Sequence, residues 1–371
     1  MVLRVRDKDA RTRVPLLALW CFFAILFLTG FLYIVRIGLQ DESAQYVRGM
    51  VIKHAPPSPE LDKKDYNTRM LSLANIPIST TTPPTLQELE RAIASSTSAW
   101  PVKNIPYPKV GAILPFYRIV AYYGNFYSKG MGVLGQYPED VMLEKLQSEI
   151  ARWNAVDPST PVMPAIHYIV TTAQGLPQKD GSYSLRMPDS QIDHALELAK
   201  KVNGIVFIDF QIGKSTVQKE LPLYENYIAL PNVHVGVDPE FSMKGSAPPG
   251  REIGTLDAQD INWVMNYMAG LVKKNDLPPK ILIIHRFTQD MVTHARAIKP
   301  LPEVQFVMDM DGWGDQAKKK NTYARVVVSE PVQFTGFKLF YKNDLLPPST
   351  GLLTPAELLK LTPRPIYIQY Q

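Results

Sequence analysis

The sequence contains a single cysteine, Cys21, so no disulfide framework within the chain can stabilise it. It also lacks a strong excess of either charge. The net charge is only +5, and part of that excess lies in the first residues, so the composition does not indicate a nucleic-acid partner. With 46% apolar and 20% charged residues over 371 positions, the chain has the composition of a globular protein with one large domain or two average ones.

A basic tail opens the chain, and an uncharged apolar run follows it. The tail covers residues 1–13 and the run covers residues 14–35. As a helix this run would be ~33 Å long, which is enough to cross a hydrocarbon core of ~30 Å. We therefore predict a transmembrane helix over residues 14–38, in contact with the lipid bilayer of the plasma membrane. A buried core helix is the alternative.

A small-x-small cleavage motif is missing between the apolar run and Arg36, so the run is not expected to be a removed signal peptide. The basic side should stay in the cytoplasm, which predicts a single-pass protein with its C-terminal domain outside. Residues 39–103 are polar and proline-rich and predict a weakly structured stalk, interrupted by one helix near residues 85–97. Residues 104–371 are the predicted ectodomain.

Apolar segments alternate with amphipathic ones throughout this ectodomain. The clearest helices are expected at Glu139–Asn154, Ser190–Val202 and Ala258–Lys274. Alternation predicts a parallel sheet, and a count of eight strands predicts an α/β fold of the (β/α)8, TIM-like type. The chain ends on the eighth strand, so the helix over residues 86–96 is expected to replace the missing eighth helix. The eight strands are expected at residues 119–124, 162–170, 204–213, 232–241, 280–287, from 304 onward, 332–341 and 365–371.

The rival architecture, an open doubly wound sheet, would carry a glycine fingerprint directly after its first strand. The segment GMGVLG at 130–135 is not one, because it lies well past the first strand and is followed by Tyr137 and Pro138. The closed barrel is therefore favoured.

The stretch VQFVMDMDGWG at 304–314 shows where a site is expected. Two carboxylates, Asp309 and Asp311, follow an apolar run at the carboxyl end of a strand, which is the edge where barrels bind ligands. Either carboxylate alone would serve equally well as a helix cap. Because the same pattern recurs at other strand ends, closure would gather these polar side chains in one mouth.

Carboxylates gathered in this way can divide into a general acid and a base, and exposed aromatic rings can stack on sugars. Simpler roles remain open: core histidines at 167 and 285, a capping role for Asp209, and a cross-barrel ion pair for Lys338. The candidate catalytic residues are Glu240, Asp209, Asp309, Asp238 and Asp311. The candidate substrate-binding residues are Tyr122, Tyr123, Asn125, His167, Gln211, His285, Arg286, Trp313, Lys338 and Gln369.

Residues 109–371 resemble the TIM barrels of glycoside hydrolases, and the strings AYYGNF, GQYPED, VDPEF and MDMDGWG resemble those of uncharacterised exported bacterial proteins. The resemblance implies the architecture. Residue roles do not transfer, because the large retaining clan has Asn-Glu after strand four and glutamate after strand seven. This chain has Asp238-Pro239-Glu240 and Lys338 there, and it lacks the DxxDxDxE string of chitinase-like barrels.

The sequence is compatible with three functions. The leading hypothesis is a membrane-anchored extracytoplasmic hydrolase of a cell-envelope or extracellular glycan, without a cofactor, in which Glu240 donates a proton and Asp209 or Asp309 is base or nucleophile. The second is a non-catalytic glycan-binding or envelope scaffold protein. The third is a metal-dependent hydrolase or deacetylase, although the first strand lacks the HxH string of amidohydrolase barrels. Its candidate ligands are His167, Asp209, Asp238, His285 and Asp309.

Overall fold

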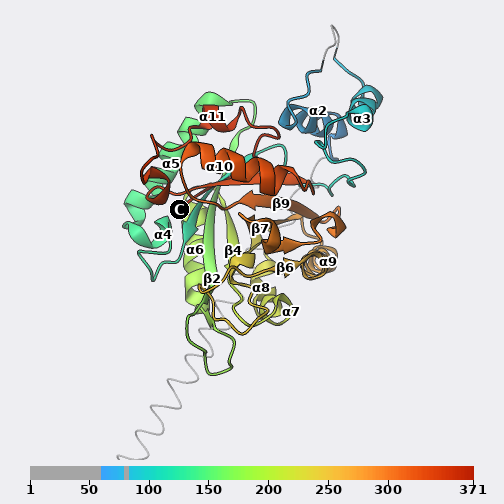
Figure 1. Ribbon diagram of the computed structural model, residues 1–371. Helices are drawn as coiled ribbons and strands as arrows, with labels where there is room; N and C mark the ends of the chain where they lie inside the picture. Colours follow the sequence, from blue (N-terminus) through green and yellow to red (C-terminus); the bar gives the residue numbers. More distant parts are fainter. Residues whose placement is uncertain (1–59, 79–82) are drawn as a thin grey trace, which may run out of the picture. The chain divides into compact units, whose positions relative to one another are not determined.

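The computed structural model describes residues 60–78 and 83–371 (Figure 1). The predicted basic tail and the predicted transmembrane helix at 14–38 lie outside these ranges. Within them, none of the helices combines the length and the apolar character that a bilayer crossing requires.

Eight parallel strands close into a barrel, which confirms the predicted fold and the architectural resemblance. The first strand, β1, pairs with β2 on one side and with the last strand, β11, on the other, so the eight-stranded barrel is closed. The order around the barrel is β1 (Arg118–Gly124), β2 (Val162–Ala173), β4 (Ile205–Phe210), β5 (Val233–Val237), β7 (Lys280–Arg286), β9 (Val304–Met310), β10 (Phe334–Leu339) and β11 (Tyr367–Tyr370).

Both faces of every barrel strand are buried, which explains the nearly continuous apolar runs of the sequence. Alternate residues serve two separate cores. Ile119, Phe207 and Ile283 point inward and fill the lower half of the barrel. Val120 and Val206 belong to the larger core between the strands and the surrounding helices.

The longer predicted helices are present with bounds close to those expected. The outer layer consists of α4 (Val133–Gln136), α5 (Glu139–Val156), α6 (Asp189–Lys201), α7 (Val217–Glu220), α8 (Glu225–Ile228), α9 (Ala258–Lys274), α10 (Gln316–Thr322) and α11 (Pro355–Leu358). The helix α10 continues as a π-helical turn over Tyr323–Val328. Three short strands lie outside the barrel: β3 (Ser184–Arg186), β6 (Leu256–Asp257) and β8 (Val292–Thr293).

Two helices precede the barrel. The helix α3 (Leu86–Ser95) begins with a capping box formed by Thr85 and Glu88, but it packs on α2 (Lys63–Leu73) and does not replace an eighth barrel helix. The helix α2 was not predicted, and it lies in the segment assigned to the stalk. Its side chains Tyr66 and Met70 pack against the inward residues at the amino-terminal end of the barrel, and α2 thus forms a floor.

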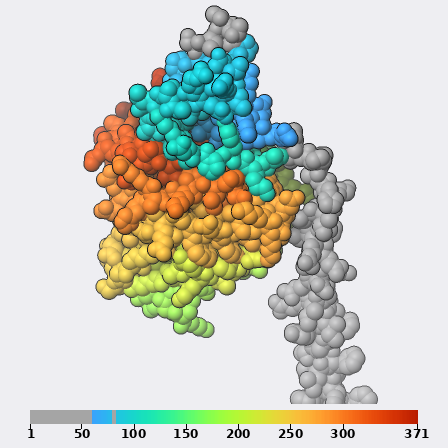
Figure 2. Space-filling view, turned by 90° about the vertical axis from the view of Figure 1, so that its right-hand side faces the viewer, coloured from blue at the N-terminus to red at the C-terminus, as the bar shows by residue number. Residues whose placement is uncertain are grey.

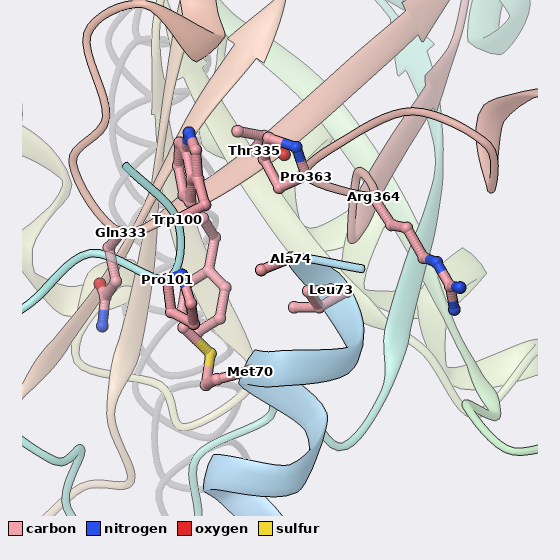
Figure 3. A pocket seen from close by; sticks show the side chains of 10 residues that line it. Met70, Leu73, Ala74, Trp100, Pro101, Gln333, Thr335, Pro363 and Arg364 are labelled. Atoms are coloured by element: carbon pink, nitrogen blue, oxygen red, sulfur yellow. The ribbon is translucent and has the colours of Figure 1, made fainter. Parts of the chain in front are cut away.

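The segment between α3 and β1 joins this floor to the barrel wall. The backbone N–H of Lys109 donates to the Pro302 carbonyl at 2.8 Å, and the Trp100 indole N–H donates to the Val328 carbonyl at 3.4 Å. In Figure 2 the blue and teal residues accordingly lie against the orange residues of the barrel. Figure 3 shows the side chains that line a small cavity there, Met70 and Trp100 among them. The volume of this cavity is about 10 Å³. It has room for about one water molecule, so it is no substrate site.

Candidate active site

Polar side chains fill the upper half of the barrel interior, at the carboxyl ends of the strands. They replace the apolar side chains of the lower half and are almost entirely buried. We call this group the polar cluster. It consists of Tyr123, His167, Asp209, Gln211, Asp238, His285, Asp309, Asp311, Lys338 and Gln369.

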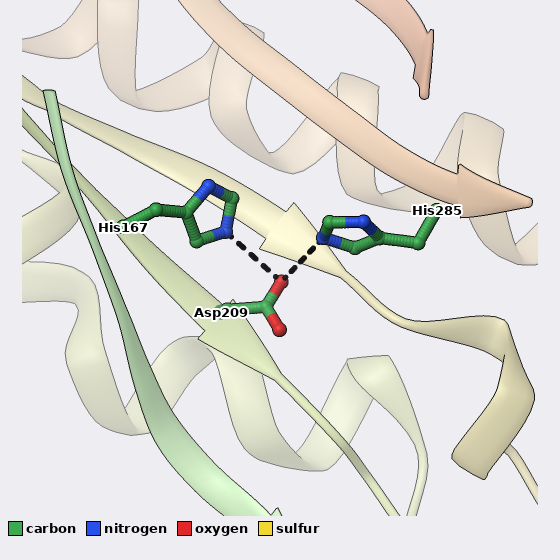
Figure 4. Close-up of side chains that lie close together, drawn as sticks. All are labelled: His167, Asp209 and His285. Atoms are coloured by element: carbon green, nitrogen blue, oxygen red, sulfur yellow. Dashed lines mark ion pairs between the residues drawn. The ribbon is translucent and has the colours of Figure 1, made fainter. Parts of the chain in front are cut away.

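Asp209 lies at the centre of the cluster. Its Oδ1 is 3.3 Å from His167 Nε2 and 3.4 Å from His285 Nε2, and Figure 4 shows the two imidazole rings approaching this oxygen from two sides. Its Oδ2 accepts a hydrogen bond of 3.1 Å from the Tyr123 hydroxyl. The far ring nitrogens have partners of their own: His167 Nδ1 lies 2.6 Å from the Tyr367 hydroxyl, and His285 Nδ1 lies 3.2 Å from Asp309 Oδ2.

A second charge pair lies nearer the mouth. The Lys338 ammonium is 3.0 Å from Asp311 Oδ1, and it also stands 3.9 Å from the centre of the Tyr123 ring. An ammonium at that distance from an aromatic face gains a cation–π attraction in addition to its ion pair. Lys338 therefore pairs with an acid at the end of the neighbouring strand β9, and not with one across the barrel as considered from the sequence.

Glu240 is the carboxylate of the site that solvent reaches most readily. It follows β5 in the 3-10 turn Pro239–Phe241 and is only partly buried. Partial burial, followed by the negative charge of Asp311, raises the pKa of Glu240 from 4.5 to about 7. Burial also raises the pKa of Asp238 well above its ordinary value, and Asp311 and Glu240 add to that shift.

Asp311 shows the opposite behaviour. Burial alone would raise the pKa of Asp311, but the Lys338 ammonium and then His285 lower it below the ordinary range. Two neighbouring carboxyl groups thus differ in charge near neutral pH: Asp311 is ionised, while Glu240 is close to its midpoint.

The two histidines also differ. Burial lowers the pKa of His167 to about 4, so this ring is neutral at physiological pH. Burial opposes the charge of His285 too, but the carboxylates of Asp209, Asp309 and Asp311 together outweigh it and raise the pKa of His285 well above its ordinary value. The same histidines lower the pKa of Asp209 against the effect of its burial.

Two glycines within the strands make room for these side chains. A Cβ at Gly236 would lie 2.3 Å from Asp209 Oδ1 and 2.5 Å from His167 Nε2. A Cβ at Gly336 would lie 2.5 Å from Asp309 Oδ1. A glycine inside a strand often marks such a close approach, so Gly236 and Gly336 were a signal of the site in the sequence, although they were not predicted as part of it. Tyr367, the hydroxyl partner of His167, was not predicted either.

Besides Glu240, which follows β5, four of the predicted site residues are not in the cluster. Tyr122 points to the outside of the barrel, where its hydroxyl meets Tyr341 at 3.0 Å. Asn125 bonds to the Ile169 carbonyl at 3.0 Å and to its own loop, and Arg286 bonds to loop carbonyls including Val292 O at 3.0 Å. Trp313 is 49% exposed, and the Lys318 ammonium lies 4.8 Å from its ring centre. The expectation that all four join the cluster is thus corrected. Tyr122 and Arg286 face outward because alternate residues of a strand face opposite sides, whereas Asn125 and Trp313 lie in the loops after β1 and β9.

A helix-capping role was considered for Asp309, Asp311 and Asp209. In α10, a different residue caps the helix. Asp315 caps this helix by accepting from the Ala317 and Lys318 backbones. All three carboxylates lie inside the barrel instead. Their catalytic roles, and that of Glu240, stay predictions.

No protein-family model and no curated protein sequence matches this chain. Among solved structures, a Bacillus subtilis mannanase, BCman, is 13% identical with a TM-score of 0.35, over 68% of this chain and 79% of that one. A ruminal GH26 endo-β-1,4-mannanase is 11% identical (TM-score 0.33, 69% and 59%). The Plasmodium falciparum HPPK-DHPS is 9% identical (TM-score 0.35, 78% and 53%). Scores this low carry no argument about activity, and the architecture rests on the strand pairing of the chain itself.

Proposed function

We propose that the protein is a hydrolase that cleaves glycosidic bonds by carboxylate general acid–base catalysis. The observation that carries the proposal is the contrast between Glu240 and Asp311 at the mouth of the barrel. A pair of carboxyl groups with separated pKa values supplies one protonated acid and one ionised base or nucleophile. Glu240 is the proton donor in this proposal, because it combines access to solvent with a raised pKa.

Asp311 is the better candidate for the second carboxylate than Asp209 or Asp309. The side chains of Asp209 and Asp309 are fully buried below the mouth. Asp311 lies above them and keeps a small exposed area. Whether it acts as base or nucleophile follows from the anomeric form of the product, because inversion requires a wider separation of the two carboxyl groups than retention.

A carbohydrate is proposed as the ligand because exposed aromatic rings lie in the loops on this side of the barrel. Trp313 follows β9 and Tyr127 follows β1, with exposed fractions of 49% and 66%. Loops after the strands form the ligand-binding face of barrels of this type. Flat aromatic faces with a polar edge suit the apolar faces of sugar rings.

The pH dependence of kcat/KM tests the acid role. Because the raised pKa of Glu240 is about 7, the protonated donor is present below that pH and is lost above it. We expect kcat/KM on a cell-envelope glycan to fall about tenfold for each pH unit well above 7. A profile that stays flat from pH 6 to pH 9 would contradict this assignment. Glu252→Gln, in the exposed loop that follows, should leave the profile unchanged.

We further propose that residues 14–38 anchor the protein in the plasma membrane as a single pass, with residues 104–371 outside. The support is the uncharged run with its basic flank. The full chain should sediment with membranes after an alkaline wash, and protease added to sealed cells should digest the ectodomain. A chain without residues 1–38 should be released into the soluble fraction. If the ectodomain is protected from external protease, the proposed orientation is wrong.

A metal-dependent hydrolase is the second candidate, and one observation favours it: His167, Asp209 and His285 converge on one point. If turnover requires a bound metal, this second candidate is favoured over the leading proposal. Glycan binding without turnover would instead favour the scaffold protein.

A further inference from the structure

From the convergence of His167, Asp209 and His285 we infer a site for a divalent first-row transition metal inside the barrel. The site does not depend on glycan hydrolysis, and it leaves the roles of Glu240 and Asp311 unchanged. We call these three residues the metal triad. They come from β2, β4 and β7, so each ligand is held by a strand of the barrel wall.

Two of the three separations within the triad fit a bound ion. Each residue offers one atom, His167 Nε2, Asp209 Oδ1 and His285 Nε2, and these atoms lie within 4.8 Å of one another. The two oxygen–nitrogen separations are 3.3 and 3.4 Å. An ion about 2.0–2.2 Å from each ligand in tetrahedral geometry sets its ligands roughly 3.3–3.5 Å apart.

Hydrogen bonding does not account for these short separations. Although fully buried, none of the three converging atoms has a hydrogen-bond partner of suitable direction within the described part of the chain. Buried polar atoms are rarely left in this condition, because each one costs about 1–3 kcal/mol. A cation at the point that they share would satisfy all three at once.

The surroundings of the histidines orient them as in metal sites. In such sites the nitrogen that does not bind the ion usually contacts a carboxylate or another polar group, which fixes the ring. His285 Nδ1 lies 3.2 Å from Asp309 Oδ2, and His167 Nδ1 lies 2.6 Å from the Tyr367 hydroxyl. Both Nε2 atoms therefore remain directed at Asp209.

Space for the ion is provided by Gly236. The missing side chain at this position faces both Asp209 Oδ1 and His167 Nε2, and any Cβ there would occupy the space beside them. Two imidazoles and one carboxylate suit Zn²⁺, Fe²⁺, Co²⁺ or Mn²⁺, and three protein ligands leave a position open.

Metal content is the direct test. The full chain, purified without chelator, should carry about one equivalent of metal, or should take up one equivalent of Zn²⁺ after treatment with a chelator. At a Zn²⁺ concentration 100 times Kd, the thermal midpoint should rise by about 5 °C. Substitution of Co²⁺ should give the intense visible absorption of a four- or five-coordinate ion, which aqueous Co²⁺ lacks.

Variants assign the ion to the triad. His167→Gln, Asp209→Asn and Gly236→Ala should each lower the bound Co²⁺ or Zn²⁺ at least tenfold, with folding checked by circular dichroism. His294→Gln removes a histidine from an exposed His–Asp pair with a separation of 2.6 Å, and Gly270→Ala adds a methyl group where nothing lies within 4 Å. Both controls should bind metal as the parent does.

Less than one-tenth of an equivalent after incubation with Zn²⁺, Co²⁺, Mn²⁺ and Fe²⁺ would overturn the inference. Full binding by a folded Asp209→Asn chain would do the same. If none of the triad variants folds, the Co²⁺ spectrum of the parent chain decides, because a six-coordinate aqueous spectrum excludes the site. A chain that takes up no metal but still cleaves glycan would remove this site and leave the proposed function intact, whereas a loaded chain without turnover would do the reverse.

Discussion

Replacing Glu240 with glutamine is expected to lower kcat/KM on an unactivated glycan by about 10²–10⁴-fold, the range that general acid catalysis contributes. Glutamine has nearly the same shape but cannot supply a proton to the leaving oxygen. The loss should disappear on an aryl glycoside whose phenolate leaves without protonation. Initial rates on both substrates at pH 6 give the comparison.

The matched control is Glu252→Gln, the same change in the loop that follows Glu240, at an exposed position. It should retain the activity of the parent on both substrates. Equal loss on the activated and the unactivated substrate would remove Glu240 from the role of proton donor, because that pattern indicates a defect in binding or folding.

Glu240→Gln is expected to be more stable than the parent protein at pH 8, so unfolding would not explain its loss of activity. The folded pKa of Glu240, about 7, exceeds the ordinary 4.5. Between pH 4.5 and about pH 7 the folded chain therefore holds a proton on Glu240 that the unfolded chain has released. The free energy of unfolding falls as the pH rises through this window. Above pH 7 the parent carries the full penalty, roughly 2 kcal/mol after allowance for partial exposure. Glutamine avoids it, and below pH 4 the two should be alike.

Replacing Asp344 with alanine is expected to lower the free energy of unfolding by about 3–5 kcal/mol, because it leaves a buried ammonium without its counter-ion. Asp344 Oδ2 lies 2.8 Å from Lys319 Nζ, and both side chains are 2% exposed. Asp344 also accepts backbone hydrogen bonds from Gly314 at 3.0 Å and Phe340 at 2.9 Å. It thus ties the loop after β9 to the loop after β10.

Urea unfolding at pH 7 measures this effect. Asp290→Ala removes an exposed aspartate and should change stability by less than about 0.5 kcal/mol. The double variant Lys319→Met with Asp344→Leu should be less destabilised than Asp344→Ala, because no unpaired charge remains. A cost below 1 kcal/mol for Asp344→Ala would show that the pair is solvated or dispensable.

The strands were predictable because each is a short apolar run bounded by turn residues, and eight such runs alternate with amphipathic helices. The helix α2 was not, because KKDYNTRMLSL carries few apolar residues and only Tyr66, Asn67, Met70 and Leu71 become buried. Its contacts with the barrel join segments more than 40 residues apart, which local patterns do not report.

The composition of the site was more predictable than its geometry. Polar residues at strand ends identified the cluster members, since few other reasons bring His285 or Asp309 into an apolar strand. Which residues face inward was not decided, because a strand buried on both faces loses the alternation that would separate Tyr122 from Tyr123. The ångström-scale meeting of Asp209 with two histidines follows from strand register, which no single segment contains.

At the two glycine positions in β5 and β10, the stability of the fold and the function of the site favour different residues. Filling either with a methyl-bearing residue would displace the carboxylate beside it, while the barrel around it already has the apolar material of an ordinary core. Repeated selection of this chain for heat resistance alone would therefore favour uncharged residues at 209 and 309 and larger ones at 236 and 336. Selection for turnover or ion retention would keep all four as they are.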